Sequence, residues 1–242
     1  PALWGWPAAA WVVLLTYGIG LVSFLDDRGG IPVPVRFGIH LLAASLLVVG
    51  GRLWISALTL PVLGSLDLGW LAVPVSIGFL VWMTNLYNFM DGMDGFAGGM
   101  TVVGGGVLAG FGAEAGNGFL LVTAMCVAAA AGGFLFHNFP PARIFMGDVG
   151  SVSLGFLLGA LILIGIHDGV FDFWTPIMLF SPFIVDATVT LLRRAVRGER
   201  IWQAHRSHYY QRLVLLGWGH RRTVLAEYGA MVLCGVLAWG YQ

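Results

Sequence analysis

Long apolar runs, separated by short polar segments, leave this chain of 242 residues few possible folds other than a bundle of membrane-spanning helices. Hydrophobic residues make up 58% of the chain and charged residues only 10%, whereas soluble domains have about 25% charged residues. A helix needs about 20 mostly apolar residues to cross a bilayer. We therefore expect an all-α, polytopic membrane protein with about eight transmembrane helices, over residues 8–25, 35–51, 70–84, 96–113, 118–136, 149–167, 172–192 and 223–240.

The arginines support this division, because nearly all of them fall on one side of it. If the chain crosses at every expected span, the segments on the first side are 26–34, 85–95, 137–148 and 193–222. These segments hold ten of the twelve basic residues, while Arg36 lies at their edge and Arg52 falls on the other side. By the positive-inside rule, the first side is cytoplasmic.

The domain organisation follows from the same division. We expect a single membrane domain over residues 1–242, in which residues 193–222 form a basic cytoplasmic loop with a histidine motif. Residue 1 is Pro, and no basic segment with a cleavage site follows it. We therefore expect the complete protein to have further N-terminal sequence.

The first polar motif lies between two apolar runs, where Asn85, Asn88, Asp91 and Asp94 recur every third residue. On a helix this spacing would place two amides and two carboxylates along one face. Ionisable residues in or beside membrane segments are costly and are functional by default. The alternative is a polar interfacial turn with Asp-Gly dipeptides, which does not explain the repeated spacing.

A second motif, Asp26-Asp27, ends the first apolar run. Adjacent carboxylates repel each other, so together they attract a divalent cation or raise the pKa of one member. Mg²⁺ is typically held by one or two carboxylates together with substrate phosphates. The alternative is a helix C-terminal turn paired with Arg28, although acids at that position oppose the helix dipole.

A third motif covers residues 137–151, where Asp148 lies between two glycines and Ser151 is the predicted N-cap of the next helix. A helix N-terminus with nearby glycines is a natural anion site, and Asp148 there is suited to hold a metal against the anion. Capping alone would leave Asn138 and Phe145 unexplained.

The basic segment contains His205, Arg206 and His208, which we expect to contact a diphosphate. Arg193 and Arg194 lie next to a span, and we interpret them as topology determinants or anchors for anionic lipid. Asp186, inside the seventh expected span, is predicted to be a buried partner of a loop arginine rather than a catalytic residue.

These motifs, in this order, resemble those of the polyprenyl-phosphate N-acetylhexosamine-1-phosphate transferases, and the resemblance covers most of residues 20–215. It implies transfer of a sugar-1-phosphate from a UDP-sugar, UDP-GlcNAc or a related one, to undecaprenyl phosphate, with release of UMP. It also implies dependence on Mg²⁺, with Mn²⁺ as an alternative. The implied setting is the bacterial cytoplasmic membrane, with the active site facing the cytoplasm.

The family initiates cell-envelope polysaccharides, and the sparse histidine motif here favours priming of O-antigen (lipopolysaccharide) or another polysaccharide over peptidoglycan synthesis. The resemblance allows a homodimer and implies no nucleic-acid partner. Members usually have more spans than this chain and a Gly-rich cytoplasmic segment before the Asp-Asp motif. The resemblance therefore implies that the given sequence lacks N-terminal spans and that segment.

The resemblance also implies roles for the matching residues. Asp148 would be the principal Mg²⁺ ligand, and Asp26 and Asp27 would share the catalytic and metal-binding roles with it. Phe145 would lie near uracil. Substrate binding would fall to Asn85, Asn88, Asp91, Asp94, Asn138, Phe145, His205, Arg206 and His208.

Two other readings remain at this stage. A CDP-alcohol phosphotransferase also has an Asp-Gly-rich motif at a membrane face, but it expects Ala-Arg soon afterwards, and here Ala97 is followed by Gly98. An ion-coupled transporter with a carboxylate relay would need acids near the bilayer midplane and a repeated half. The acids here lie at span ends, so the transferase is the favoured reading.

Overall fold

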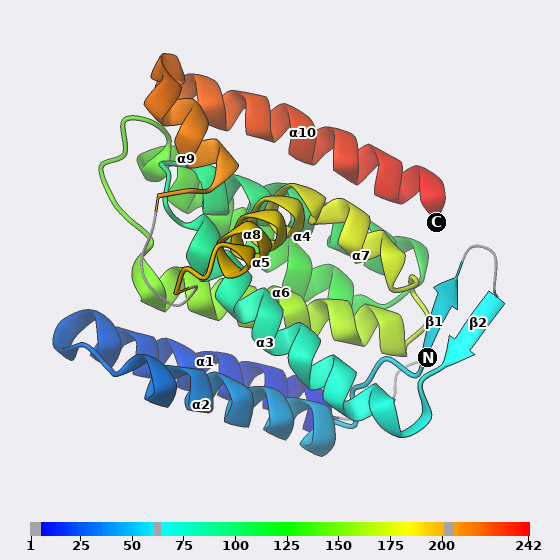
Figure 1. Cartoon of the computed structure of the whole chain (residues 1–242). Coiled ribbons are helices and arrows are strands. Elements are labelled where there is room, and N and C mark those ends of the chain that lie inside the picture. The colour runs from blue at the N-terminus through cyan, green and yellow to red at the C-terminus, as the bar shows by residue number, and fades with distance from the viewer. Residues whose placement is uncertain (1–5, 61–63, 201–205) are drawn as a thin grey trace.

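The computed structural model describes residues 6–60, 64–200 and 206–242, which form a bundle of helices with one small β-hairpin (Figure 1). In chain order the elements are α1 (Trp6–Gly29), α2 (Val33–Ser45), η1 (Leu46–Gly50), β1 (Ala57–Leu60), β2 (Gly64–Asp67), η2 (Gly69–Leu71), α3 (Ala72–Met90), α4 (Phe96–Glu114), α5 (Gly118–Asn138), α6 (Gly147–His167), α7 (Trp174–Leu179), α8 (Ser181–Val196), α9 (Tyr209–Leu213), η3 (Val214–Trp218) and α10 (Gly219–Tyr241).

The prediction of an all-α, multi-pass membrane protein is confirmed. Within the described ranges, seven helical segments are long and apolar enough to cross a membrane, and each contains or largely overlaps one expected span. These segments are Ala8–Gly29, Val33–Gly50, Gly69–Met90, Phe96–Glu114, Gly118–Asn138, Gly147–His167 and Tyr209–Tyr241.

The remaining expected span, 172–192, is divided between the short helix α7 and the longer helix α8. The helix is interrupted at Phe180, where φ is −93° and ψ is 11°. Pro182 follows in the first turn of α8, and a proline lacks the N–H that a continuous helix would need there. Neither helix alone has the length of a membrane span, which explains why seven long segments are found rather than eight.

Together, α7 and α8 still carry the chain from one end of the bundle to the other. Just before α7, Asp172 accepts a hydrogen bond from the Tyr241 hydroxyl at 2.7 Å, at the same end as the contact between Asn117 and Asp168. In the first half of α8, Asp186 accepts a hydrogen bond from the Tyr209 amide at 2.9 Å. We therefore expect the pair α7–α8 to form a broken eighth crossing, which would preserve the parity of the predicted topology.

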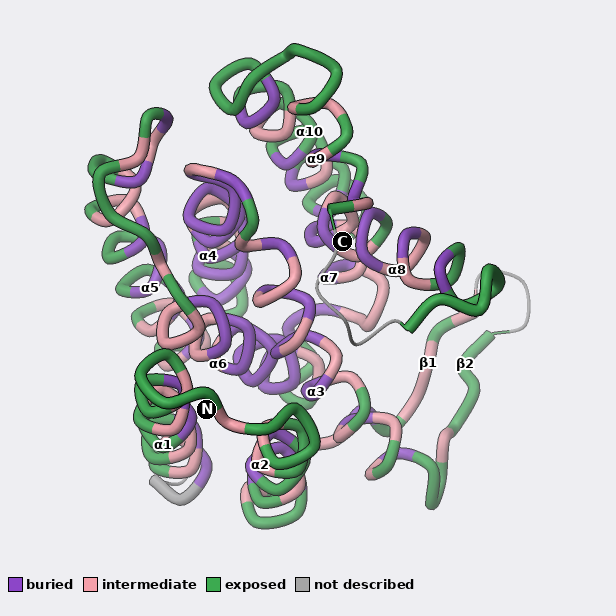
Figure 2. Tube along the Cα trace, turned by 60° about the vertical axis from the view of Figure 1, so that its left-hand side comes forward, coloured by how far each residue is buried: buried purple, intermediate pink, exposed green. Residues whose placement is uncertain are grey.

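The centre of the bundle is formed by α4 and α6, which have the largest buried fractions among the seven long segments. Figure 2 shows both as mostly buried, while α1, α2 and α10 lie outside and expose many residues. In α6, Gly155 lets α3 approach closely, since a Cβ there would lie 2.6 Å from the Met83 carbonyl oxygen. Small residues at such crossings are typical of membrane helix packing.

Two features differ from the sequence prediction. The segment 193–222 is not a loop: it contains the end of α8, all of α9 and η3, and the first turn of α10. The antiparallel hairpin of β1 and β2 was not predicted, and it contacts the bundle where the Thr59 carbonyl accepts a hydrogen bond from the Trp174 indole N–H. A two-stranded ribbon of four residues per strand gives too weak a sequence pattern to recognise.

The topology can be tested with single cysteines at the two ends of the bundle. Arg197→Cys follows α8 and Ala115→Cys follows α4, and both positions are exposed. With Cys126 and Cys234 replaced by alanine, we expect a membrane-impermeant maleimide to label the two sites from opposite sides of sealed vesicles. Labelling of both from the same side would contradict the eight crossings.

Candidate active site

The acids predicted from the sequence gather at one end of the bundle, around the guanidinium group of Arg36. Arg36 Nη1 lies 2.9 Å from Asp26 Oδ2 and 2.9 Å from Asp148 Oδ2. Asp26 is at the end of α1, Arg36 in the first turn of α2 and Asp148 in the first turn of α6. One cation therefore joins two carboxylates from helices that are far apart in the sequence. We call Asp26, Arg36 and Asp148 together the acid cluster.

Asp26 is held firmly, because its other oxygen accepts a hydrogen bond from the Ile31 amide at 2.5 Å and its side chain is only 8% exposed. The alternative pairing with Arg28 is not seen, since the Arg28 guanidinium lies over the Phe24 ring at 4.4 Å. Asp26 is thus tied to the loop that follows its own helix and to α2.

The side chain of Asp27, which belongs to α1, lies against the N-terminus of α6. Its two carboxylate oxygens are 3.4 Å from the Asp148 and Val149 amides, where the helix dipole favours negative charge. Gly147 makes this approach possible: its φ is +64°, and a Cβ there would lie 3.1 Å from Asp27 Oδ2. The predicted anion site at this helix N-terminus is therefore occupied by a carboxylate of the chain itself.

The prediction that Ser151 caps α6 is wrong. The helix already begins at Gly147, so Ser151 lies one turn inside it and its hydroxyl donates to the Gly147 carbonyl at 2.9 Å. The Gly147 backbone adopts a left-handed conformation that permits this earlier start.

The first polar motif is only partly helical, because α3 ends at Met90. Asn88 Nδ2 donates to Asp148 Oδ1 at 2.7 Å, so α3 contacts the acid cluster directly. Asn85, one turn earlier, donates instead to the Val81 carbonyl of its own helix. Asp91 and Asp94 lie in the segment that joins α3 to α4 rather than on the helical face expected from their spacing.

A pocket of about 410 Å³, which we call the acid pocket, opens beside the acid cluster. It is lined by residues from the ends of α3, α5, α6 and α10 and from the connecting segments. Six of them were predicted site residues, namely Asn88, Asp91, Asp94, Asn138, Phe145 and Asp148, and the others are Gly92, Met93, Met146, Gly147 and His220. The structure thus brings half of the twelve predicted residues to one cavity.

The pocket wall is fixed by contacts between its segments. Asn138 is buried; its side-chain oxygen accepts from the Gly95 amide at 2.8 Å and its amide donates to the Ile144 carbonyl at 2.8 Å. Asp94 Oδ2 accepts from the Ala142 amide at 3.1 Å. Asn138 therefore supports the wall, whereas Phe145 is exposed at its rim, with 77% of its surface accessible.

The C-terminal helix α10 completes this wall. His220 Nδ1 lies 3.3 Å from Asp94 Oδ2, and the Tyr228 hydroxyl donates to the Gly95 carbonyl at 2.7 Å. The Asp94 segment is therefore held between α10 and the connection that follows α5.

Asp91 has an unusual environment for an acid. Burial and the nearby Asp148 carboxylate raise the pKa of the Asp91 carboxyl to about 7. The folded state therefore favours protonated Asp91, and its preference for that form contributes stability that is lost as the pH rises from about 4 towards 7. Near neutral pH this group can both donate and accept hydrogen bonds.

His208 does not lie in the pocket. Its side chain is 3% exposed, and its Nδ1 is 3.1 Å from Asp186 Oδ1. Asp186 also accepts from the backbone amides of Tyr209 and Tyr210, at 2.9 and 3.1 Å. Asp186 is buried, as predicted, but its partners are a loop histidine and the start of α9 rather than an arginine.

The other residues of the predicted histidine motif also lie outside the acid pocket. Arg206 lines a different pocket, at the end of α8, and His205 lies outside the residues that the structure describes. Two contributors were missed by the sequence analysis: Arg36 was considered only for topology, and His220 was not assigned any role. A lone arginine inside an apolar run was the available signal for the first.

The donor atoms at this end suit a hard cation such as Mg²⁺. Asp26 and Asp148 both place an oxygen 2.9 Å from the positive Arg36 Nη1, so this end of the bundle combines carboxylate ligands with a cationic group. In the described part of the chain, no group of three or more His, Cys, Asp or Glu side chains is gathered as a metal site. One or two carboxylates combined with ligand phosphates is the arrangement that Mg²⁺ commonly adopts.

Several known proteins are similar to this chain over most of its length. Residues 9–166 match the model of glycosyl transferase family 4. The chain is 36% identical over 211 residues to a probable undecaprenyl-phosphate N-acetylglucosaminyl 1-phosphate transferase of Bacillus subtilis, covering 86% of this chain and 59% of the relative. It is 34% identical to a phospho-N-acetylmuramoyl-pentapeptide-transferase of a Synechococcus strain, covering 98% and 73%.

A decaprenyl-phosphate N-acetylglucosaminephosphotransferase of Mycobacterium tuberculosis is 31% identical over 260 residues, covering 98% of this chain and 63% of the relative. The chain thus spans about three fifths of the Bacillus and Mycobacterium relatives. The match to the family model extends over more than half of the chain and includes Asp26, Asn88 and Asp148. This chain belongs to glycosyl transferase family 4.

Proposed function

We propose that this protein transfers a HexNAc-1-phosphate from a UDP-sugar to a polyprenyl phosphate and releases UMP, at the cytoplasmic face of a bacterial membrane. The observation that supports this most is the single pocket that joins Asn88, Asp91 and Asp94 to Asp148, beside Asp26 and Asp27. Relatives whose names specify this type of transfer agree with the proposal.

The reaction needs little covalent help from the protein. An oxygen of the acceptor phosphate forms a bond to the phosphorus that carries the sugar, and the bond from that phosphorus to the UMP oxygen breaks. Such phosphoryl transfers depend on positioning and on neutralising charge. Mg²⁺ held by Asp148 and the substrate phosphates would neutralise the diphosphate charge, and Arg36, which contacts Asp148, adds a second positive charge beside it.

The two adjacent acids have different roles in this proposal. Asp26 positions Arg36, because it is nearly buried and already accepts two short hydrogen bonds. Asp27 is exposed and its contacts to the α6 amides are long, so it is available to accept a proton from the acceptor phosphate. Phe145, exposed at the pocket rim, is placed to stack on the uracil ring.

The proposed activity is tested with radiolabelled UDP-GlcNAc, undecaprenyl phosphate and Mg²⁺ in detergent. We expect a labelled lipid and an equivalent amount of UMP, and loss of both products with EDTA. Consumption of a CDP-alcohol in place of the UDP-sugar, or no lipid product with any UDP-HexNAc, would contradict the proposal.

Asp94→Asn should weaken donor binding while leaving the fold intact. The asparagine oxygen can still accept from the Ala142 amide, but it loses the charge that attracts His220 and a bound ligand donor. A hydrogen bond to a charged group contributes about 1.5–3 kcal/mol, so we expect a rise in KM for the UDP-sugar of about 10-fold or more. The KM for the lipid acceptor and the thermal unfolding midpoint are the controls, and both should stay unchanged.

A further inference from the structure

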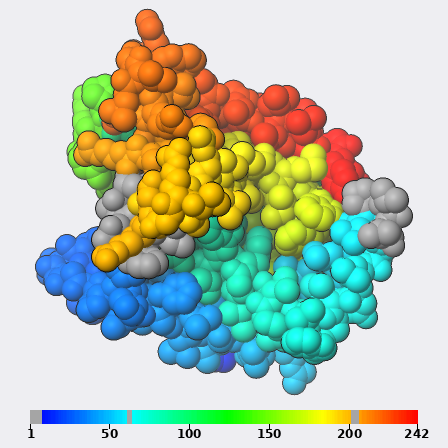
Figure 3. Space-filling model, viewed as in Figure 1, coloured from blue at the N-terminus to red at the C-terminus, as the bar shows by residue number. Residues whose placement is uncertain are grey.

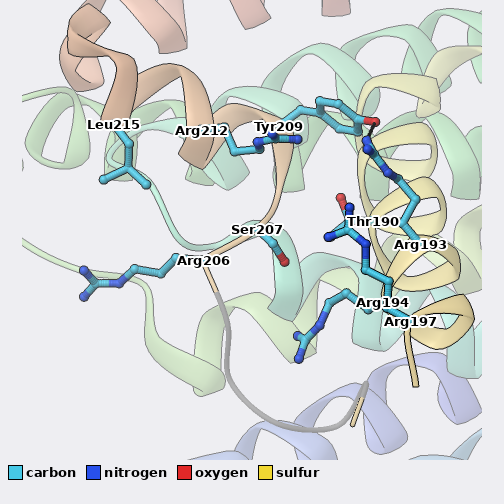
Figure 4. Close-up of a pocket in the computed structure, with 9 residues that line it drawn as sticks. All are labelled: Thr190, Arg193, Arg194, Arg197, Arg206, Ser207, Tyr209, Arg212 and Leu215. Carbon is cyan, nitrogen blue, oxygen red and sulfur yellow. Dashed lines mark hydrogen bonds between the residues drawn. The ribbon is translucent and has the colours of Figure 1, made fainter. Parts of the chain in front are cut away.

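A second pocket, of about 350 Å³, lies between the end of α8 and the start of α9. Among the described residues it is lined by five arginines, Arg193, Arg194, Arg197, Arg206 and Arg212. Figure 3 shows α8 and α9 next to each other on this face of the molecule. In Figure 4, three of the arginines extend from the last turns of α8, while Arg212 and Tyr209 face them from α9.

The positive charge of this arginine pocket is largely uncompensated by the described chain. Arg194 Nε pairs with Glu199 at 2.8 Å, and no carboxylate is among the described residues that line the cavity. Arg193 and Arg197 are exposed. Like charges gathered in a concave surface repel one another and attract anions from solution.

Tyr209 holds two of these arginines in place. Its hydroxyl accepts a hydrogen bond from Arg193 Nη1 at 2.7 Å, and the guanidinium carbons of Arg193 and Arg212 each lie 5.9 Å from its ring centre. A neutral phenol positions the guanidinium groups without neutralising them. Planar guanidinium groups held in this way are well suited to bind phosphate oxygens.

Exposed apolar side chains lie on the same helical segments as this pocket. Leu215 lines it and is 70% exposed, and Leu192, Val196 and Leu216 on the adjoining turns are also exposed. A soluble phosphate would gain nothing from these residues. A ligand with a phosphate head and hydrocarbon tails would contact both the arginines and the apolar surface.

We propose that this arginine pocket binds the head group of an anionic phospholipid, such as phosphatidylglycerol, in the leaflet at this end of the bundle. The head-group phosphate contacts Arg193, Arg197 and Arg212, and the acyl chains lie along the exposed leucines and valine. This site is separate from the acid pocket, whose lining shares no residue with it, and it does not depend on the proposed transfer activity.

The test compares two double variants that each remove two arginines from the same end of the bundle. Arg193→Gln/Arg197→Gln alters the pocket, whereas Arg221→Gln/Arg222→Gln alters exposed arginines of α10 outside it. Native mass spectrometry of the purified protein in neutral detergent measures the apparent Kd for phosphatidylglycerol, with phosphatidylcholine as the zwitterionic reference. Inorganic phosphate and undecaprenyl phosphate are titrated as competitors.

We expect phosphatidylglycerol to bind more tightly than phosphatidylcholine. Its Kd should rise about 10-fold or more in the pocket variant and less than about 3-fold in the α10 variant, since each arginine near a membrane surface adds appreciably to anionic lipid binding. An equal rise of this Kd in both variants would show that general surface charge attracts the lipid, and it would overturn the proposal. Displacement by inorganic phosphate at equal concentration would identify a soluble-anion site instead. A pocket variant that loses only undecaprenyl phosphate binding would assign the pocket to the acceptor.

Discussion

Asp148→Asn is expected to lower the rate of sugar-phosphate transfer by at least ~10²-fold, the scale observed when one preorganised electrostatic contact is removed. Asp148 is the acid on which Arg36 and Asn88 converge, at 2.9 and 2.7 Å. An asparagine has nearly the same size but lacks the negative charge that attracts a hard cation. The measurement is kcat for labelled lipid product at saturating UDP-GlcNAc and Mg²⁺.

The same variant should remain folded, because Arg36 keeps its contact with Asp26 and one side-chain oxygen remains at residue 148. We expect a loss of about 1 kcal/mol in unfolding free energy, the usual value of one hydrogen bond. Glu114→Gln, at the exposed end of α4 on the opposite side of the bundle, is the matched control and should keep full activity. Substantial Mg²⁺-dependent transfer by Asp148→Asn would move the proposed metal site to Asp26 and Asp27.

Asp186→Asn is expected to destabilise the protein more than the same substitution at Asp94 or Asp148. Asp186 accepts hydrogen bonds from the Tyr209 and Tyr210 amides and the Thr190 hydroxyl, and it contacts His208. An asparagine has one accepting oxygen, so buried donors would lose their partner at about 1–3 kcal/mol each. We expect a loss of about 3 kcal/mol in unfolding free energy, measured by thermal or denaturant unfolding in detergent.

Asp67→Asn serves as the control for this second variant, because Asp67 is exposed in β2 and its side chain accepts a hydrogen bond from the nearby Gly69 amide, also at the surface. A surface change of this kind should alter stability by less than about 0.5 kcal/mol. If Asp186→Asn abolished transfer while its unfolding midpoint stayed at the wild-type value, Asp186 would be a catalytic group rather than a structural one.

The sequence predicted the spans well because bilayer thickness requires a run of apolar residues of nearly fixed length. Parity then placed Asp26, Asn88 and Asp148 at the same end, and the structure shows these residues within one hydrogen-bonded cluster. Such reasoning identifies the end of a helix at which a residue lies, but it does not give the rotation of that helix about its axis.

Rotation and local packing account for what was missed. Arg36 enters the cluster because the first turn of α2 faces α1 and α6, and a lone arginine in an apolar run indicates a polar contact without identifying its partners. His208 was predicted to contact ligand because histidine and arginine cluster there, yet it is buried against Asp186. The interruption at Phe180 lies in an apolar run whose average composition is that of an ordinary span.

Part of the acid pocket is formed by α10, which lies outside the residues that the family model matches. The family model matches residues 9–166, whereas His220 and Tyr228 reach the Asp94–Gly95 segment from the last helix. Relatives can therefore keep every residue of the matched region and still differ in this wall of the pocket, which we propose adjoins the sugar nucleotide. With the donor bound there as proposed, donor preference would depend on this helix as well as on the motifs, so sorting members by donor calls for comparing the helix equivalent to Gly219–Tyr241.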